Sequence, residues 1–505
     1  MDFQINEKQY AKISFALKRI ENSICEENGA SINFIFSILY DLISNFLAVI
    51  VNNQYQNINS PGVDLSCRIV NEASSILKMD LRHKKLDERQ KNIQTDFYWT
   101  SEYNNYKPFW DILKENSDYN LLKQRVEAAK QSISNYYDKN GRKTEDNLFI
   151  NDPSSFMKKS KDDNTRYENI VLNYSLLGQQ TLDAYRYFSI FVHPNNIKDE
   201  YKRELLSYRE NYIDELLKIV NLVFIEPFEI INDSNDFEIN NCAKDTIQKF
   251  IQPLDDIMNQ LYDYLHSHEF TNECWFILKA KEIIKEMLIS FFNNLKAHTI
   301  ALFKVLLEFC GVSFAIGSKN YLFSQDNFNI VCKGFQASTD IMFDGFFKRC
   351  GIKKHFSSEK EIQDIYNSFY KKKYKVDYRT FRHELSMNRL YFLSNGKKSY
   401  SKYAHMIINK FGEDEDEIKL LLFLNNISLD MSHSSGYILN GGVDRTKSLS
   451  EQVIIKSLLL VLYFIEQQWP HTDTVDNETL YNNAINGINS IIDNFETLIE
   501  KNEKI

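Results

Sequence analysis

Glycine and proline are scarce in this chain, with 15 Gly and 7 Pro among 505 residues. Tight turns depend on these two residue types, so their scarcity argues against an all-β protein with many short hairpins. Long disordered segments are also disfavoured, because 43% of the residues are hydrophobic and only 26% are charged. Long helices joined by short polar turns fit this composition.

The chain has few cysteines, and no two of them form a CxxC pair. They stand at Cys25, Cys67, Cys242, Cys274, Cys310, Cys332 and Cys350. An odd number of scattered cysteines excludes a regular disulfide framework and offers no zinc-ligand spacing. We therefore expect reduced thiols in a cytoplasmic protein.

A secretory signal and a membrane span are missing as well. The N-terminus MDFQINEKQYAKISF lacks a basic stretch followed by an apolar one. The longest apolar runs, Phe46–Val51 and Leu458–Ile465, are far shorter than the roughly 18 to 20 residues that a membrane span needs. The sequence predicts no membrane association.

The net charge of −9 gives no overall attraction for nucleic acid, so any such contact must be local. The sequence contains no P-loop, no glycine-rich dinucleotide turn and no GxSxG motif. His266 and His268, and the pair His383 and Glu384, have no third ligand at zinc-site spacing. The sequence therefore predicts no cofactor and no metal.

Hydrophobic residues recur with helical periodicity through most of the chain. The segments that show it are Ile32–Val51, Leu121–Tyr137, Arg166–Val192, Glu200–Phe224, Ala243–Leu265, Cys274–Phe309, Ser450–Gln468 and Thr479–Lys501. Asn140–Asp163 is predicted to be an insertion and Asn440–Lys447 a loop. The fold class predicted from this pattern is all-α.

Two pairs of segments suggest a tandem duplication. Tyr185–Asn196 is similar to Asn425–Gly436 at an offset of 240, and Val63–Leu77 is more faintly similar to Phe328–Met342 at an offset of 265. The polar segment Asn232–Asn241 lies between the copies. We predict two diverged helical-bundle domains, 1–236 and 237–505.

The duplication makes specific predictions about the second copy. Arg68 should superpose on Lys333, and His193 should lie close to His433. The second copy has Asn426 in place of Arg186, and Ala337 in place of Glu72. His433 is therefore not expected to be catalytic.

One helix face in the first copy combines several polar residues. Asp183, Arg186 and His193 stand at steps of three or four (with Ser189 or Ile190 between), and Arg186 and His193 are about 10.5 Å apart along a helix axis. Pro194 should end the helix at His193. A guanidinium and an imidazole on one face are suited to holding a phosphate and moving a proton beside it.

A second helix could add to this face, since Arg68 and Glu72 are spaced four apart and could point toward it. The alternative needs no catalysis. A buried ion pair of Asp183 with Arg186 would hold helices together, with His193 as the C-cap.

The run Arg186–His193 resembles the Arg-x(4–6)-His motif of HEPN-superfamily ribonucleases, which are all-helical domains common in bacterial toxin–antitoxin and abortive-infection systems. The resemblance covers Ile32–Phe224. It implies metal-independent RNA cleavage, with His193 as general acid/base on the attacking 2′-hydroxyl and Arg186 stabilising the phosphorane. Tyr187 departs from the pattern, because many family members have a polar residue directly after the arginine.

The resemblance also implies an arrangement of subunits and a biological role. Such domains place two motifs face to face, so either two chains form a homodimer or the second half acts as a degenerate partner. The function expected is an endoribonuclease in phage defence or a toxin. The alternative is a non-catalytic scaffold or regulatory subunit of a defence system, working with a partner protein.

A single strong basic cluster lies in the second half. It comprises Lys371, Lys372, Lys373, Lys375, Arg379 and Arg382. Aromatic residues alternate with these cations, namely Tyr370, Tyr374, Tyr378 and Phe381. Such a cluster could bind an RNA backbone and stack bases. The alternative is a solvated helix face whose aromatic residues lie in the core.

Overall fold

The computed structural model describes a set of ranges, to which all structural statements apply. These are residues 13–15, 17, 34–55, 59–82, 127, 131, 171, 178–194, 207–209, 211–213, 216, 242–316, 337, 348, 359–375, 377–386, 400–432, 443–470 and 475–503. Helices account for nearly all of them, and these ranges contain no strand. The all-α prediction is confirmed.

The described helices fall into two groups along the chain. The first group lies before residue 236: α2 (Phe34–Gln54), α3 (Pro61–Arg82) and α9 (Gln179–Val192). The second comprises α12 (Cys242–Ser267), α13 (Thr271–Phe292), α14 (Lys296–Ile316), α17 (Glu359–Ile365), the π-helix η4 (Tyr366–Tyr370), α18 (Lys371–Tyr374), α19 (Tyr378–Ser386), α20 (Tyr400–Phe411), α21 (Glu415–Met431), α22 (Val443–Gln468) and α23 (Val475–Glu503).

The two turns that join α12 to α13 and α13 to α14 have the same geometry. Glu269 and Asn294 adopt left-handed backbone angles, with φ of 62° and 65°. In each turn the next residue, Phe270 or Leu295, donates its N–H to the carbonyl five residues earlier, at 2.9 and 2.8 Å. This is the Schellman arrangement, which ends a helix and reverses the chain. The single helix expected over Cys274–Phe309 was therefore wrong: the Asn294 turn divides it into α13 and α14.

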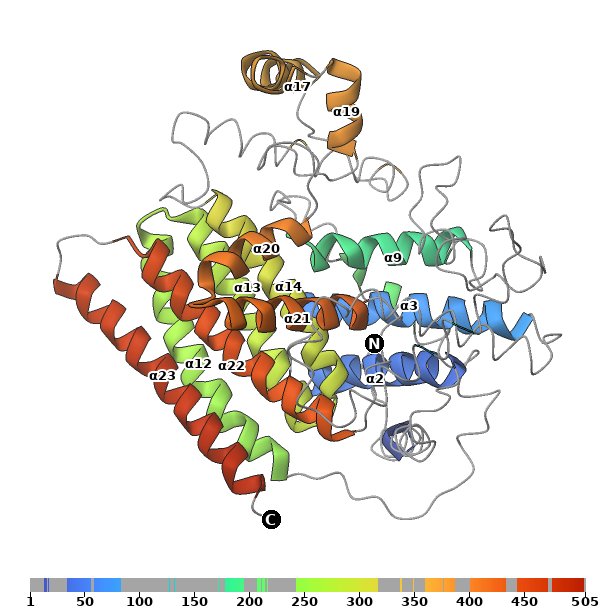
Figure 1. The fold of residues 1–505 in the computed structure, drawn as a ribbon, viewed down its shortest axis with the longest axis vertical. Coiled ribbons are helices and arrows are strands. Elements are labelled where there is room, and N and C mark those ends of the chain that lie inside the picture. The colour runs from blue at the N-terminus through green and yellow to red at the C-terminus, as the bar shows by residue number, and fades with distance from the viewer. Residues whose placement is uncertain are drawn as a thin grey trace.

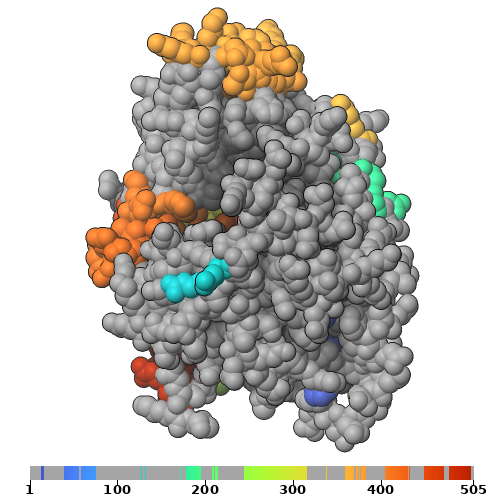
Figure 2. All heavy atoms as spheres, turned by 45° about the vertical axis from the view of Figure 1, so that its right-hand side comes forward, coloured from blue at the N-terminus to red at the C-terminus, as the bar shows by residue number. Residues whose placement is uncertain are grey.

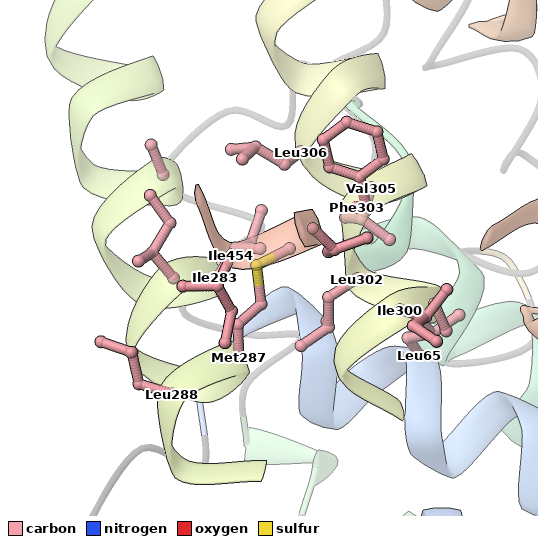
Figure 3. Packing of buried hydrophobic residues seen from close by; sticks show 14 of the residues in the cluster. Leu65, Ile283, Met287, Leu288, Ile300, Leu302, Phe303, Val305, Leu306 and Ile454 are labelled. Atoms are coloured by element: carbon pink, nitrogen blue, oxygen red, sulfur yellow. The ribbon is translucent and has the colours of Figure 1, made fainter. Parts of the chain in front are cut away.

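Helix α14 is the centre of the bundle. It packs against α13, α20, α21 and α22, and it also contacts α2 and α3 (Figure 1). α23 packs against α12 and α22 as an outer layer. Figure 3 shows how Met287 of α13, Leu302 of α14, Leu65 of α3 and Ile454 of α22 belong to one cluster of buried side chains. Burying a side chain of this size contributes about 1.5–3 kcal/mol.

The hydrophobic core is continuous across the predicted domain boundary at residue 236. Buried residues of α2, α3 and α9 belong to the same cluster as those of α12, α13 and α14. Lys333 and His433, which the duplication predicts to match Arg68 and His193, lie outside the described residues. The segments Asn140–Asp163 and Asn232–Asn241 lie outside them too. The duplication and the two-domain division stay predictions.

Several predicted boundaries shift. The helix expected over Arg166–Val192 is interrupted at Gly178, whose φ of 54° is left-handed: Val171 is helical, and α9 begins at Gln179. The loop expected over Asn440–Lys447 was wrong from Val443 onward, because α22 begins there. The Asp-Arg-Thr-Lys segment carries no proline or glycine that would stop a helix, so the apolar helix that follows extends into it.

Two described helices are long and apolar enough to cross a membrane by length and composition. Lys296–Phe314 lies wholly within the core, and 61% of Ser448–Gln468 is buried. Core helices of soluble proteins have the same properties, so this observation does not decide membrane association.

Candidate functional site

A row of polar residues runs along the buried side of α3. Ser60, Asp64, Arg68 and Glu72 are spaced four apart, so they lie on one helix face, and all four are buried. Each meets a partner from a different part of the chain. Ser60 donates a hydrogen bond to Glu286 of α13, and Asp64 forms an ion pair with Arg209 at 2.8 Å.

Arg68 and Glu72 belong to a group that we call the Glu308 cluster, which comprises Arg68, Glu72, His193, Lys304 and Glu308. The His193 Nδ1–H donates to Glu308 Oε2 at 3.0 Å. The guanidinium NH1 of Arg68 lies 3.4 Å from the other ring nitrogen, Nε2. Lys304 Nζ lies 3.6 Å from Glu308 Oε1. With Nδ1 as donor, Nε2 is left as an acceptor facing a cation.

Arg68 is bound on further sides. Its NH2 donates to the backbone carbonyl of Ser432 at 2.8 Å, and its Nε lies 4.0 Å from Glu72 Oε1. Tyr185 of α9 donates its hydroxyl to the same Glu72 oxygen at 2.8 Å. The cluster therefore connects α3, α9, α14 and the end of α21. The side chain of Arg68 is only 1% exposed.

Asp41 of α2 lies near Glu72 and carries an unusual carboxyl group. Burial raises its pKa well above the ordinary value, and the charge of Glu72 raises it further. Both effects favour the protonated form of Asp41. A neutral carboxyl group at this position avoids placing a second negative charge beside Glu72 in the core.

The electrostatics of the Glu308 cluster follow from opposing effects. Burial alone would raise the pKa of Glu308, but Lys304, His193 and Arg68 overcome it and bring that pKa to about 2. Burial lowers the pKa of His193, and the charges of Lys304 and Arg68 lower it further, while Glu308 offsets part of this. Burial also lowers the pKa of Lys304. At neutral pH the imidazole is therefore neutral and Glu308 is ionised.

His193 is the member of the cluster that solvent reaches. Its side chain is 24% exposed, against 3% for Glu308 and 5% for Lys304. It lies directly after α9 with extended backbone angles (φ −90°, ψ 152°), and its N–H donates to the carbonyl of Ser189 at 3.4 Å. Pro194 follows and prevents the helix from continuing. A neutral imidazole at the edge of a buried charge cluster can take up a proton from a ligand.

The structure brings together some of the predicted site residues and not others. Arg68, Glu72 and His193 come together, as the prediction proposed. Arg186 and Asp183 lie on α9 as half-buried residues, and Asp183 accepts a hydrogen bond from Gln179 at 3.1 Å. The charged groups with the largest effects on His193 are Glu308, Lys304 and Arg68. The arginine beside the imidazole is thus Arg68 of α3.

Sequence reasoning missed Glu308 and Lys304. Both lie in the segment LFKVLLEFC, where two charges four apart interrupt an otherwise apolar helix. A charge in such a segment must be paired when the helix is buried, so these two residues were detectable as partners for other charges. The contact of Glu308 with His193, at the end of α9, was not detectable. These residues are 115 positions apart, and pairing over that distance leaves no local pattern in the sequence.

Tyr187, the residue that departs from the family pattern, is buried among aromatic rings. Its ring packs against Phe188 and Tyr212, with ring centroids 5.3 and 4.8 Å apart. Burial raises the pKa of its hydroxyl, and the charge of Arg209, the partner of Asp64, offsets part of that rise. Burial raises the pKa of Asp64 to about 7, because the neighbouring arginine offsets only part of the cost of burial.

A further buried group involves His298 of α14. Its Nε2 lies 2.9 Å from Glu286 Oε1, and its Nδ1 lies 3.1 Å from the Ser66 hydroxyl. Asn52 of α2 donates to the same Glu286 oxygen at 3.2 Å. All these side chains are buried, so this group joins α2, α3, α13 and α14 without access for a ligand.

The predicted basic cluster lies in a different place, on α18, α19 and the turn between them. Lys371, Lys372, Lys375 and Arg379 are exposed. Arg382 forms an ion pair with Glu359 at 2.8 Å. Lys373 lies in α18, and its side chain falls outside the described residues.

The predicted absence of a metal stays a prediction. Within the described residues, no group of three or more His, Cys, Asp or Glu side chains is placed to hold a metal ion. His268 Nδ1 instead lies 2.8 Å from the carbonyl of Tyr264, and the side chains of His383 and Glu384 lie outside the described residues.

Comparison with known proteins gives no relative. No protein family, no curated protein and no solved structure matches this chain. The resemblance to HEPN-superfamily ribonucleases therefore rests on the residues described above.

Proposed function

We propose that this chain is a HEPN-like, metal-independent endoribonuclease acting in phage defence or as a toxin. One observation carries the proposal. The partly exposed imidazole of His193 has Nδ1 held by the buried carboxylate of Glu308, and Nε2 faces the guanidinium of Arg68. A histidine oriented by a carboxylate, beside a fixed cation, is suited to general acid/base cleavage of a phosphodiester.

The proposed reaction uses this chain's own groups. Nε2 of His193 accepts the proton of an RNA 2′-hydroxyl, and the 2′-oxygen then forms a bond to the adjacent phosphorus. The bond from phosphorus to the 5′-oxygen breaks, and the His193 imidazolium returns its proton to that oxygen, which leaves a 2′,3′-cyclic phosphate and a 5′-hydroxyl. Glu308 fixes the ring orientation and stabilises the imidazolium as it forms. Arg68 supplies positive charge toward the phosphorane, a role that the resemblance assigned to Arg186.

A second candidate function is favoured by the burial of Arg68. Its guanidinium is 1% exposed and already bonded to the Ser432 carbonyl, as expected for an arginine that holds helices together. On this view the chain is a non-catalytic scaffold or regulatory subunit. The two candidates differ in what happens when His193 alone is changed.

The test measures RNA cleavage and folding together. Wild type, His193→Ala and Arg186→Ala are purified and incubated with 5′-labelled RNA in the presence of EDTA. The proposal expects His193→Ala to lose cleavage, a change of at least 100-fold. Its melting temperature should stay within about 2 °C of wild type, because a partly exposed residue at a helix end costs little to truncate. His266→Ala, an exposed histidine on α12, is the matched control.

The outcomes separate the candidates. Products with a 2′,3′-cyclic phosphate, lost in His193→Ala and unchanged in His266→Ala, support the ribonuclease. Equal cleavage by wild type and His193→Ala would refute the ribonuclease proposal. Unfolding of His193→Ala would favour the scaffold. His433→Ala is expected to be nearly silent.

A further inference from the structure

A small helical unit stands apart from the bundle. We call it the basic arm; it comprises Glu359–Arg382, with α17, η4, α18 and the start of α19. Its helices pack on one another through η4. Figure 1 shows α17 and α19 at one end of the molecule, away from the other labelled helices. In Figure 2 the same residues form the top edge of the surface.

The arm has its own small core, and aromatic residues that were expected to stack on bases lie in or against it. Tyr366 and Phe381 are buried, with ring centroids 5.4 Å apart. Tyr378 packs against Tyr366 at 5.2 Å and donates its hydroxyl to Glu359. Tyr366 and Phe381 are therefore buried within the arm, and Tyr378 is half-buried against them. The side chains of Tyr370 and Tyr374 lie outside the described residues.

The segment Lys371–Arg382 of the arm is strongly basic on an acidic protein, whereas the exposed acidic residues Glu359, Glu361 and Asp364 lie on α17. Between Lys371 and Arg382 there are six basic residues and one acidic residue, Asp377, whereas the whole chain has a net charge of −9. Such local asymmetry focuses a positive potential at one end of the molecule.

The acidic residue of this segment is already engaged. Asp377 caps α19: its carboxylate accepts hydrogen bonds from the Thr380 N–H at 2.9 Å and from the Thr380 hydroxyl at 2.8 Å. These bonds lower the pKa of Asp377. The carboxylate is therefore directed at its own helix and not at the neighbouring cations.

Four cations of the arm have no counter-charge in the part of the chain that the structure describes. They are Lys371, Lys372, Lys375 and Arg379, and all are exposed. Lys375 adopts a left-handed backbone conformation (φ 52°) at the turn between α18 and α19. That turn brings the end of α18 and the beginning of α19 together, so the four charges lie on one short stretch of surface.

We propose that the basic arm binds the phosphodiester backbone of single-stranded nucleic acid, without reading its sequence. Exposed, unpaired lysine and arginine side chains attract phosphates. Two of the three described rings are buried, so we expect the affinity to come mainly from charge. An anionic membrane is disfavoured, because the described residues of the arm include no exposed large hydrophobic side chain to insert. This inference does not depend on RNA cleavage.

The salt dependence of binding gives the expected magnitude. Each phosphate contact on a single strand contributes a slope of about −0.7 to the plot of log affinity against log salt. Four contacts give a slope of about −2.8, so raising NaCl from 50 to 200 mM should weaken binding by roughly 50-fold.

The test uses the full-length protein and a fluorescent 20-nucleotide 2′-O-methyl RNA, which has no free 2′-hydroxyl for cleavage. Anisotropy is measured for wild type and for the variant Lys371→Glu, Lys372→Glu, Lys375→Glu, Arg379→Glu. The matched control reverses four exposed lysines of the bundle: Lys244→Glu, Lys249→Glu, Lys410→Glu, Lys501→Glu. Both variants change the net charge equally.

The arm variant should weaken binding at least 50-fold at 50 mM NaCl, and the bundle variant less than 5-fold. Single-stranded DNA of the same length should bind with similar affinity. Equal losses in the two variants, or affinity independent of salt, would overturn the proposal. So would unchanged RNA binding with loss of binding to phosphatidylserine vesicles, which would make the arm a lipid-binding surface. If the reversed arm does not fold, four glutamines at the same positions give the same comparison.

Discussion

Replacing Glu308 by glutamine tests whether the buried cluster is ionised. The substitution keeps the shape of the side chain and removes its charge. Lys304 then lies in the core without its paired carboxylate, Arg68 keeps only Glu72 as a neighbouring carboxylate, and the Nδ1–H of His193 loses a charged acceptor. Removing one partner from a buried ion pair is costly because the remaining charge stays desolvated.

The pKa of Glu308 gives the expected loss of stability in Glu308→Gln. Its value falls from 4.5 to about 2 on folding. One pKa unit corresponds to about 1.4 kcal/mol, so the ionised carboxylate contributes about 3 kcal/mol to stability at pH 7. The folded-state pKa is lowered, so this contribution is complete above pH 4.5 and is lost as the pH falls toward 2. At about 2.1 cal/mol/K per residue over 505 residues, 3 kcal/mol corresponds to a decrease of about 3 °C in melting temperature.

The assay is urea unfolding of wild type and Glu308→Gln from pH 7 to pH 3.5. The difference between them isolates Glu308 from the other buried groups that titrate. It should be about 3 kcal/mol at pH 7 and should shrink by about 1.4 kcal/mol by pH 3.5. Glu282→Gln is the control, since its carboxylate lies 2.6 Å from Lys279 in a partly exposed pair and should cost less than about 1 kcal/mol.

A double-mutant cycle with Lys304→Met strengthens the test. The double variant should be less destabilised than the sum of the single variants by at least about 1 kcal/mol, because each removes the charge that the other compensates. A Glu308→Gln variant as stable as Glu282→Gln, with no coupling to Lys304, would refute an ionised cluster. A difference that does not change with pH would refute it as well.

Three further outcomes follow from the packing. Arg68→Met should destabilise the fold by about 3–5 kcal/mol in urea unfolding, because its buried partners lose a cation; a loss below 1 kcal/mol would contradict this. Gly62→Ala should cost about 1–3 kcal/mol, since its Cβ would overlap a carboxylate oxygen and a leucine methyl group, whereas at Gly487 it meets only an isoleucine side chain and should be nearly neutral. Burial raises the thiol pKa of Cys67 and Cys310, so peptide mass spectrometry should find iodoacetamide on them only after denaturation.

The fold class was predictable because helices leave a periodic pattern in the sequence. Apolar residues at helical spacing predicted α22 and α23 to within a few residues at their C-terminal ends. The division of Cys274–Phe309 into two helices was not predictable in this way. Asn293 and Asn294 turn the chain within a segment whose apolar pattern continues on both sides, and periodicity cannot register a reversal of direction.

Part of the candidate site was also predictable, because helical spacing shows which residues share a helix face. Arg68 and Glu72 share a helix face by their spacing, and Pro194 fixed the end of α9 at His193. The approach of α3 to α9 and α14 depends on tertiary packing, which spacing does not encode. The prediction therefore paired His193 with Arg186, on its own helix, whereas the cation in contact is Arg68.

The packing order bears on how the two halves correspond. α2 packs on α3 and α3 on α9, while α13 packs on α14 and α14 on α21. A single offset of 240 residues brings each helix of the first series onto its counterpart in the second. Under the predicted duplication, this order favours α14 as the counterpart of α3, with Glu308 in the place of Arg68, over the predicted counterpart Phe328–Met342.

The signs of the charges give the buried cluster a physical rationale. At a contact between two buried helices, charges of the same sign would repel each other, whereas Arg68 on α3 and Glu308 on α14 are opposite in sign. The charge of Arg68 is among those that lower the pKa of Glu308, and both groups contact His193. The cost of burying two charges is offset only when each has several partners. An imidazole at the edge of that contact is held by both halves of the chain, so its orientation depends on their remaining together.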